Sequence, residues 1–213
     1  MSMTIICTGQ SVRPAAGDYD SRGFEEAVTA ELESEIQPWS GRKYDPKDNT
    51  VWIGEGQLAL NTAAQIIRPC EPLITPLLNE IPLRAFTDTD RLYPAEKWKR
   101  KAAVQRRRAD PRQPESRDMV IRRAEALIRT VRDQNGILIT YPLFLAELLE
   151  FLRAQGFVVQ RTGLLKIQPL ERFLISHKNE HCGGCQHNCF LNNPGCGVGR
   201  DKAARKQKGN HET

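Results

Sequence analysis

The sequence lacks a long hydrophobic run. Its best candidate, from Ile137 to Leu152, is interrupted by Glu147 and Glu150, whereas a membrane-spanning helix needs about 20 consecutive apolar residues. Residues 1–4 also lack the basic group and following apolar core of a secretory signal peptide. These absences predict that the chain does not cross a membrane, and we expect a cytoplasmic protein.

The chain is not short of core-forming residues, so a disordered or collagen-like protein is excluded. Of its 213 residues, 39% are hydrophobic and 27% are charged, which is enough for one folded domain with a small appendage. The formal net charge is +5. Because the basic residues are concentrated in a few segments, this charge permits an acidic partner without specifying one.

Strand-like and helix-like segments alternate along most of the chain. Short β-branched or continuous apolar runs predict strands, and apolar residues at intervals of three and four predict helices. The alternation predicts a three-layer α/β/α domain with a mainly parallel sheet. The predicted strands are 4–7, 50–53, 137–140, 157–160 and 164–170, and the predicted helices are 25–36, 57–67, 115–132 and 143–155.

Six short segments carry a resemblance to a known family. The first is Cys-Thr-Gly-Gln-Ser after the first predicted strand, where the histidine phosphatase (phosphoglycerate mutase-like) superfamily has Arg-His-Gly-Glu/Gln-Ser/Thr. The others are similar to later motifs of that superfamily and occur in the same order. The six segments are 7–11, 23–27, 54–63, 77–81, 114–116 with Arg123, and 139–143.

This resemblance implies a fold and a phosphate pocket, but the catalytic positions differ. In the superfamily one histidine attacks phosphorus, while two arginines and a second histidine hold the phosphoryl oxygens. The matching positions here are Cys7, Thr8, Leu58 and Tyr141, with Glu80 at the position of the proton donor. Because none of the four can replace the cations and the imidazole nucleophile, we expect a catalytically inactive scaffold that binds a partner.

An alternative uses the same first loop for catalysis. Cys7 and Arg13 form a Cys-x5-Arg pattern that looks like the phosphate loop of low-molecular-weight tyrosine phosphatases. A thiolate beside backbone N–H groups and an arginine can attack phosphorus, and Glu80 would then supply the proton. This alternative is a phosphatase or phosphotransfer enzyme. The simpler interpretation is that Cys7 is a small buried residue at the end of a strand.

Four cysteines cluster near the end of the chain with the spacing Cys-x2-Cys-x3-Cys-x6-Cys. In a reducing compartment such a cluster is typical of a metal site rather than of disulfides. Four thiolates suit structural zinc, and a four-cysteine iron–sulfur cluster is the alternative. We therefore predict an α/β domain at 1–175, a metal-binding knuckle at 176–200 and a basic, disordered tail at 201–213, with Cys182, Cys185, Cys189 and Cys196 as ligands.

A basic run between residues 97 and 112 suggests a second kind of interaction. Clustered cations can hold nucleic acid through its phosphates, although such a run can also be a solvated insertion at the mouth of the pocket. We expect a protein partner, with nucleic acid as the alternative, and the oligomeric state is left open. The candidate contacts are Lys97, Lys99, Arg100, Lys101, Arg106, Arg107 and Arg108.

Overall fold

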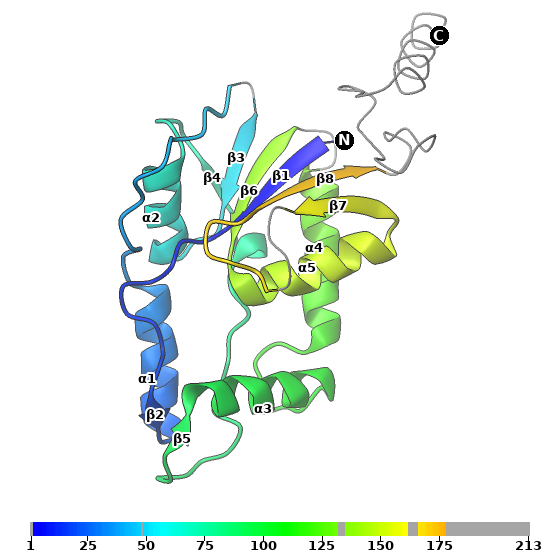
Figure 1. The fold of residues 1–213 in the computed structure, drawn as a ribbon. Helices are drawn as coiled ribbons and strands as arrows, with labels where there is room; N and C mark the ends of the chain where they lie inside the picture. Colours follow the sequence, from blue (N-terminus) through cyan, green and yellow to red (C-terminus); the bar gives the residue numbers. More distant parts are fainter. Residues whose placement is uncertain (1, 48, 132–134, 162–165, 178–213) are drawn as a thin grey trace, which may run out of the picture.

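A six-stranded sheet forms the centre of the protein (Figure 1). The structure, a computed structural model, describes residues 2–47, 49–131, 135–161 and 166–177. The strand order is β4-β3-β6-β1-β8-β7. The strands are β1 (Ser2–Cys7), β3 (Thr50–Ile53), β4 (Leu73–Ile74), β6 (Gly136–Thr140), β7 (Phe157–Arg161) and β8 (Arg172–His177).

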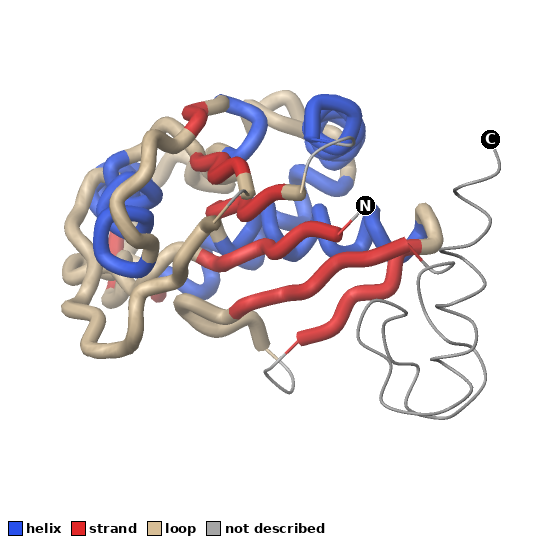
Figure 2. The backbone as a smooth tube through the Cα atoms, turned by 90° about the horizontal axis from the view of Figure 1, so that it is seen from above, coloured by secondary structure: helices blue, strands red, loops and turns tan. Residues whose placement is uncertain are grey.

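The sheet is mainly parallel, as predicted. Strand β6 pairs in parallel with both β1 and β3, and β3 pairs in parallel with β4. The last two strands differ, because β8 is antiparallel to both β1 and β7. Figure 2 shows these strands side by side from a second direction. The mixed α/β fold with a mainly parallel sheet is therefore confirmed.

Helices cover both faces of the sheet, because alternate residues of each strand point to opposite sides. On one face, Ile6 of β1 joins a cluster with Ile66 of α2 (Gln57–Ile66). On the other face, Ile5 and Cys7 join a larger cluster with residues of α4 (Arg117–Val131) and α5 (Pro142–Ala154). Strand β6 is buried along its whole length, which explains its continuous apolar sequence.

A smaller unit, here called the cap, extends beyond the carboxyl ends of the parallel strands (Figure 1). It consists of β2 (Asp18–Tyr19), α1 (Ser21–Leu32), β5 (Tyr93–Pro94) and α3 (Ala95–Arg107). Its core is aromatic: the ring centroids of Phe86 and Trp98 lie 4.5 Å apart, and Phe24 stacks on Trp98 at 5.5 Å. The indole N–H of Trp98 donates to the carbonyl of Tyr19, which ties α3 to β2.

Several predicted boundaries require correction. Helix α1 covers 21–32 rather than 25–36, because the side chain of Asp20 accepts from the backbone N–H of Gly23 and caps the helix four residues earlier. The strand predicted at 164–170 is wrong, since residues 166–171 form a loop and β8 follows at 172–177.

The basic run contains a helix, α3, which the sequence analysis did not predict. Its buried residues Ala95, Trp98, Ala102 and Arg106 follow helical spacing. Lysines and arginines between them obscured that spacing. No helix in the described ranges is both long and apolar enough to cross a membrane.

Candidate functional site

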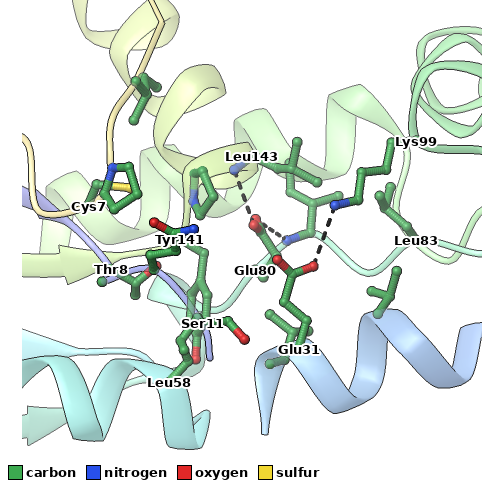
Figure 3. A pocket seen from close by; sticks show the side chains of 18 residues that line it. Cys7, Thr8, Ser11, Glu31, Leu58, Glu80, Leu83, Lys99, Tyr141 and Leu143 are labelled. Atoms are coloured by element: carbon green, nitrogen blue, oxygen red, sulfur yellow. Dashed lines mark hydrogen bonds and ion pairs between the residues drawn. The ribbon is translucent and has the colours of Figure 1, made fainter. Parts of the chain in front are cut away.

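A pocket of about 230 Å³ lies between the carboxyl ends of β1 and β6 and the cap (Figure 3). Strand ends in parallel sheets are the usual location of binding sites in α/β proteins. The loop after β1, from Cys7 to Ser11, forms one side, and Tyr141 follows β6. The remaining lining residues are Val28, Glu31, Leu32, Leu58, Glu80, Ile81, Leu83, Lys99, Pro142, Leu143, Ile167 and Pro169.

The carboxyl group of Glu80 is held by three backbone N–H groups. Ile81 donates at 2.9 Å, and Leu143 and Phe144, in the first turn of α5, donate at 3.2 and 2.9 Å. Burial raises the pKa of Glu80 to about 7, against the opposing effects of these hydrogen bonds and of Arg123. A group that titrates near neutrality can either give or take a proton, so Glu80 suits general acid–base chemistry.

The side chain of Tyr141 fills the space beside the beginning of α2. The residue is 2% exposed, and its hydroxyl lies beside the backbone of Gly56 and Ala59, whose effect on its pKa opposes that of burial. Burial raises the pKa of Tyr141 to about 12, so the phenol stays neutral. A Cβ at Gly56 would collide with this hydroxyl. Tyr141 is therefore a wall of the pocket that lies against the beginning of α2.

The other residues of the predicted phosphate pocket are buried and apolar or uncharged. Leu58 lies in the first turn of α2 with 4% exposure, and Thr8 is 2% exposed. Burial, with Glu80 and Glu171 contributing, raises the pKa of the Cys7 thiol well above its ordinary value. The thiol therefore stays protonated and is a poor nucleophile. The structure brings Cys7, Thr8, Leu58, Glu80 and Tyr141 together, as the resemblance implies.

The structure does not bring Arg13 to this group. Arg13 is exposed, and its backbone N–H donates to the hydroxyl of Ser11 at 2.8 Å. The chain continues away from the pocket, since the N–H of Val12 donates to the carbonyl of Glu35. A loop that wraps a phosphate between Cys7 and Arg13 is therefore not formed.

One ion pair links the two helices of the cap across the pocket. Lys99 of α3 lies 3.5 Å from Glu31 of α1, and both side chains are about one quarter exposed, at 29% and 26%. Lys99 is the single basic residue among the described residues that line the pocket. Lys99 was predicted to belong to a nucleic-acid surface and Glu31 was not predicted at all, because neither residue belongs to a recognisable motif.

The other predicted nucleic-acid contacts differ in their exposure. Arg106 is buried, with its guanidinium 2.7 Å from Glu147 of α5, so it cannot contact a nucleic acid. The ammonium group of Lys97 lies 3.6 Å from the ring centroid of Tyr93. Arg100, Lys101, Arg107 and Arg108 are exposed. The basic run is thus divided among the pocket, the core and the surface.

The predicted metal ligands Cys182, Cys185, Cys189 and Cys196 lie outside the described residues. Within the described ranges, no group of three or more His, Cys, Asp or Glu side chains could hold a metal ion.

The contact between Gly56 and Tyr141 predicts a coupled pair of substitutions. Gly56→Ala should lower the free energy of unfolding by about 1–3 kcal/mol, because the new methyl group overlaps the hydroxyl. Tyr141→Phe should relieve much of this loss, since the nearest remaining ring atom lies 3.3 Å from the Cβ position. A double-mutant cycle in urea measures the coupling. Additive effects of the two substitutions would contradict this contact.

The raised pKa of Glu80 predicts a pH-dependent stability. Between its ordinary value of 4.5 and about 7, the folded protein binds a proton that the unfolded chain releases. The contribution of Glu80 to the free energy of unfolding therefore decreases as pH rises through this range. In Glu80→Gln this contribution is absent. Urea unfolding of both proteins across the range should show a steeper decline for the wild type, and parallel curves would refute the assignment.

Comparisons with known proteins identify solved structures of similar fold, while no sequence-family model and no curated protein matches. A phosphoserine phosphatase mutant from Entamoeba histolytica, in complex with phosphoserine, is 12% identical with a TM-score of 0.44, covering 72% of this chain and 80% of that one. A putative alpha-ribazole-5'-P phosphatase from Escherichia coli is 18% identical with a TM-score of 0.43, covering 71% and 79%. An open-reading-frame product from Mycobacterium tuberculosis is 13% identical with a TM-score of 0.46, covering 81% and 89%.

These structures correct the prediction of a catalytically inactive scaffold. Two of them are named as phosphatases, so the prediction of an inactive protein is wrong and the phosphatase alternative is better supported. At these identities the likeness concerns the fold, and the chemistry of this chain has to be argued from its own residues.

Proposed function

We propose that the pocket hydrolyses phosphate monoesters and that Glu80 is the proton donor. The observation that carries this proposal is the position of Glu80. Its carboxyl group lies in a pocket at the ends of parallel strands, is fixed by three backbone N–H groups, and has a pKa of about 7. A carboxylic acid with this pKa is suited to protonating a leaving alcohol near neutral pH.

The reaction balances with water as the attacking group. Water forms a new bond to phosphorus while the bond to the ester oxygen breaks, and the departing oxygen takes the proton of Glu80. The resulting carboxylate is stabilised by the N–H groups of Leu143 and Phe144. The attacking water keeps both of its protons in the first product, dihydrogen phosphate. This product returns one proton to the Glu80 carboxylate and leaves as hydrogen phosphate, which regenerates the acid. Cys7 takes no part, because its thiol is held in the protonated form.

Lys99 supplies the positive charge for the phosphoryl oxygens. Its contact with Glu31 is long for an ion pair and partly exposed, so an anionic substrate can compete for the ammonium group. The charged lining consists of Lys99, Glu31 and Glu80. When Glu80 is protonated, the positive charge of Lys99 balances the negative charge of Glu31. When Glu80 is ionised, the lining of the pocket carries an excess of negative charge. The protonated state of Glu80 therefore favours both substrate binding and the chemical step.

The test is hydrolysis of an aryl phosphate by the full-length protein between about pH 5 and 9. We expect kcat/KM to decrease above pH 7, where Glu80 ionises. Glu80→Gln should lower kcat by about 100-fold or more and abolish this decrease. Glu33→Gln, an exposed carboxyl at the end of α1, is the matched control and should behave as wild type.

The same assay separates this mechanism from attack by Cys7. Cys7→Ser should retain turnover within a few-fold of wild type. Loss of turnover in Cys7→Ser, with activity retained in Glu80→Gln, would transfer the chemistry to the thiol. The proposed function would be overturned if the wild-type protein showed no more turnover than Glu80→Gln.

We also propose that Cys182, Cys185, Cys189 and Cys196 hold a structural metal ion, with zinc as the first candidate. The support is the spacing of four soft thiolate ligands. Elemental analysis of the full chain should find about one zinc per molecule, and Cys182→Ser should lower this content while Cys70→Ser does not. Iron with visible absorbance would indicate the iron–sulfur alternative, and protein without bound metal would disprove the site.

A further inference from the structure

A second hollow, here called the amino-end hollow, lies near the opposite ends of the parallel strands from the pocket. Its volume is about 370 Å³, which is within the range of small-molecule sites. The proposed hydrolysis uses none of its residues. The lining comes from β1, the start of β6, β8 and the loop before β3, and consists of Thr4, Ile6, Tyr44, Asp45, Asn49, Asn135, Gly136, Ile137 and Arg172.

The hollow exists because α2 covers only part of the sheet face on which this helix packs. Helix α2 contacts β3 and β6, and Ile6 and Ile137 are buried at the edge of the cluster beneath it. Farther along the same face, Thr4 and Arg172 are only half-buried. Ile6 and Ile137 thus lie at the bottom of the hollow with little exposed surface, and the polar side chains supply most of its accessible lining.

An arginine and an aromatic ring form one wall of the hollow. The guanidinium carbon of Arg172 lies 5.5 Å from the ring centroid of Tyr44, a distance that permits a cation–π contact. Among the described residues, no carboxylate lies within ion-pair distance of Arg172. The nearby carboxylate of Asp45 is already paired with Arg68 at 2.9 Å. Arg172 therefore retains a planar, charged surface for a ligand.

The amides on the rim offer hydrogen bonds of both kinds. The side-chain N–H of Asn49 donates to the carbonyl of Pro46 at 2.8 Å, which fixes the amide and leaves its oxygen as an acceptor. Asn135 is exposed at the rim and supplies a donor and an acceptor. A guanidinium able to stack and such a rim together match a planar heterocycle with donors and acceptors along its edge.

We infer that the amino-end hollow binds a nucleobase. The base stacks on the guanidinium of Arg172, and the amides of Asn49 and Asn135 contact its hydrogen-bonding edge. Aromatic and guanidinium planes bind unstacked bases in this way in other proteins. The base can belong to a free nucleotide or to single-stranded RNA, because both present the same chemistry to the hollow.

The test is calorimetric titration of the full-length protein with AMP, GMP, CMP and UMP, and with ribose 5-phosphate as the ligand without a base. We expect at least one nucleotide to bind with a Kd at or below about 1 mM, and ribose 5-phosphate not to bind. Arg172→Ala should weaken binding about tenfold or more. Arg172→Lys should not restore it, since an ammonium group keeps the charge but lacks the plane.

Two further variants keep the test decisive. Asn135→Ala changes an exposed residue and should weaken nucleotide binding even if Arg172→Ala fails to fold. Arg129→Ala removes an exposed arginine of α4 and is the matched control, with unchanged binding. The inference is overturned if no nucleotide binds, if ribose 5-phosphate binds as tightly as the nucleotides, or if Asn135→Ala binds them as wild type.

Short single-stranded RNA distinguishes the two sources of the base. Binding much tighter than that of the mononucleotide, with a steep decrease as salt rises, would identify RNA as the ligand. Equal affinity for the two would identify the free nucleotide. Either result supports recognition of a base in this hollow, provided that Asn135→Ala weakens it.

Discussion

The hydrogen bonds between the Glu80 carboxyl group and the first turn of α5 fix the shape of the pocket. They join the segment after the short 3-10 helix η1 (Pro76–Leu78) to the helix that follows β6. The hydroxyl of Thr140, the last residue of β6, donates to the carbonyl of Leu78 at 2.8 Å and holds the same segment from the other side. Because the Thr140 bond is buried and the Glu80 bonds are part-buried, the carboxyl group of Glu80 has one position relative to the strand ends.

The two helix N-termini beside the pocket are occupied by side chains of the protein itself. The hydroxyl of Tyr141 lies against Gly56 at the beginning of α2, and Glu80 accepts from the beginning of α5. Helix N-termini commonly bind phosphate, so this arrangement leaves Lys99 as the charged contact for a substrate. The proposed hydrolysis therefore depends on proton transfer more than on a cradle of cations, in contrast to what the resembled family would use.

The alternating pattern predicted β1, β3, β6 and β7 of the sheet but not β4 or β8. The cap depended on information that the sequence alone does not display. The apolar run at 137–140 and the spacing in 57–67 reflect burial, which sequence periodicity records directly. The burial of Arg106 depends instead on Glu147, 41 positions later. The ion pair between Glu31 and Lys99 likewise depends on how α1 and α3 pack together. The resemblance placed Cys7, Thr8, Leu58, Glu80 and Tyr141 in one pocket, but the separation of Arg13 follows from the course of the loop.

The buried pair of Arg106 and Glu147 is the connection between α3 of the cap and α5 under the sheet. Two other guanidinium nitrogens of Arg106, Nε and Nη1, are buried without a partner in the described part of the chain. Pulling the cap away would separate opposite charges in a medium of low dielectric constant, which is costly. The cap and the sheet should accordingly unfold as one cooperative unit. Access to the pocket then comes from small local rearrangements of side chains rather than from a swinging lid.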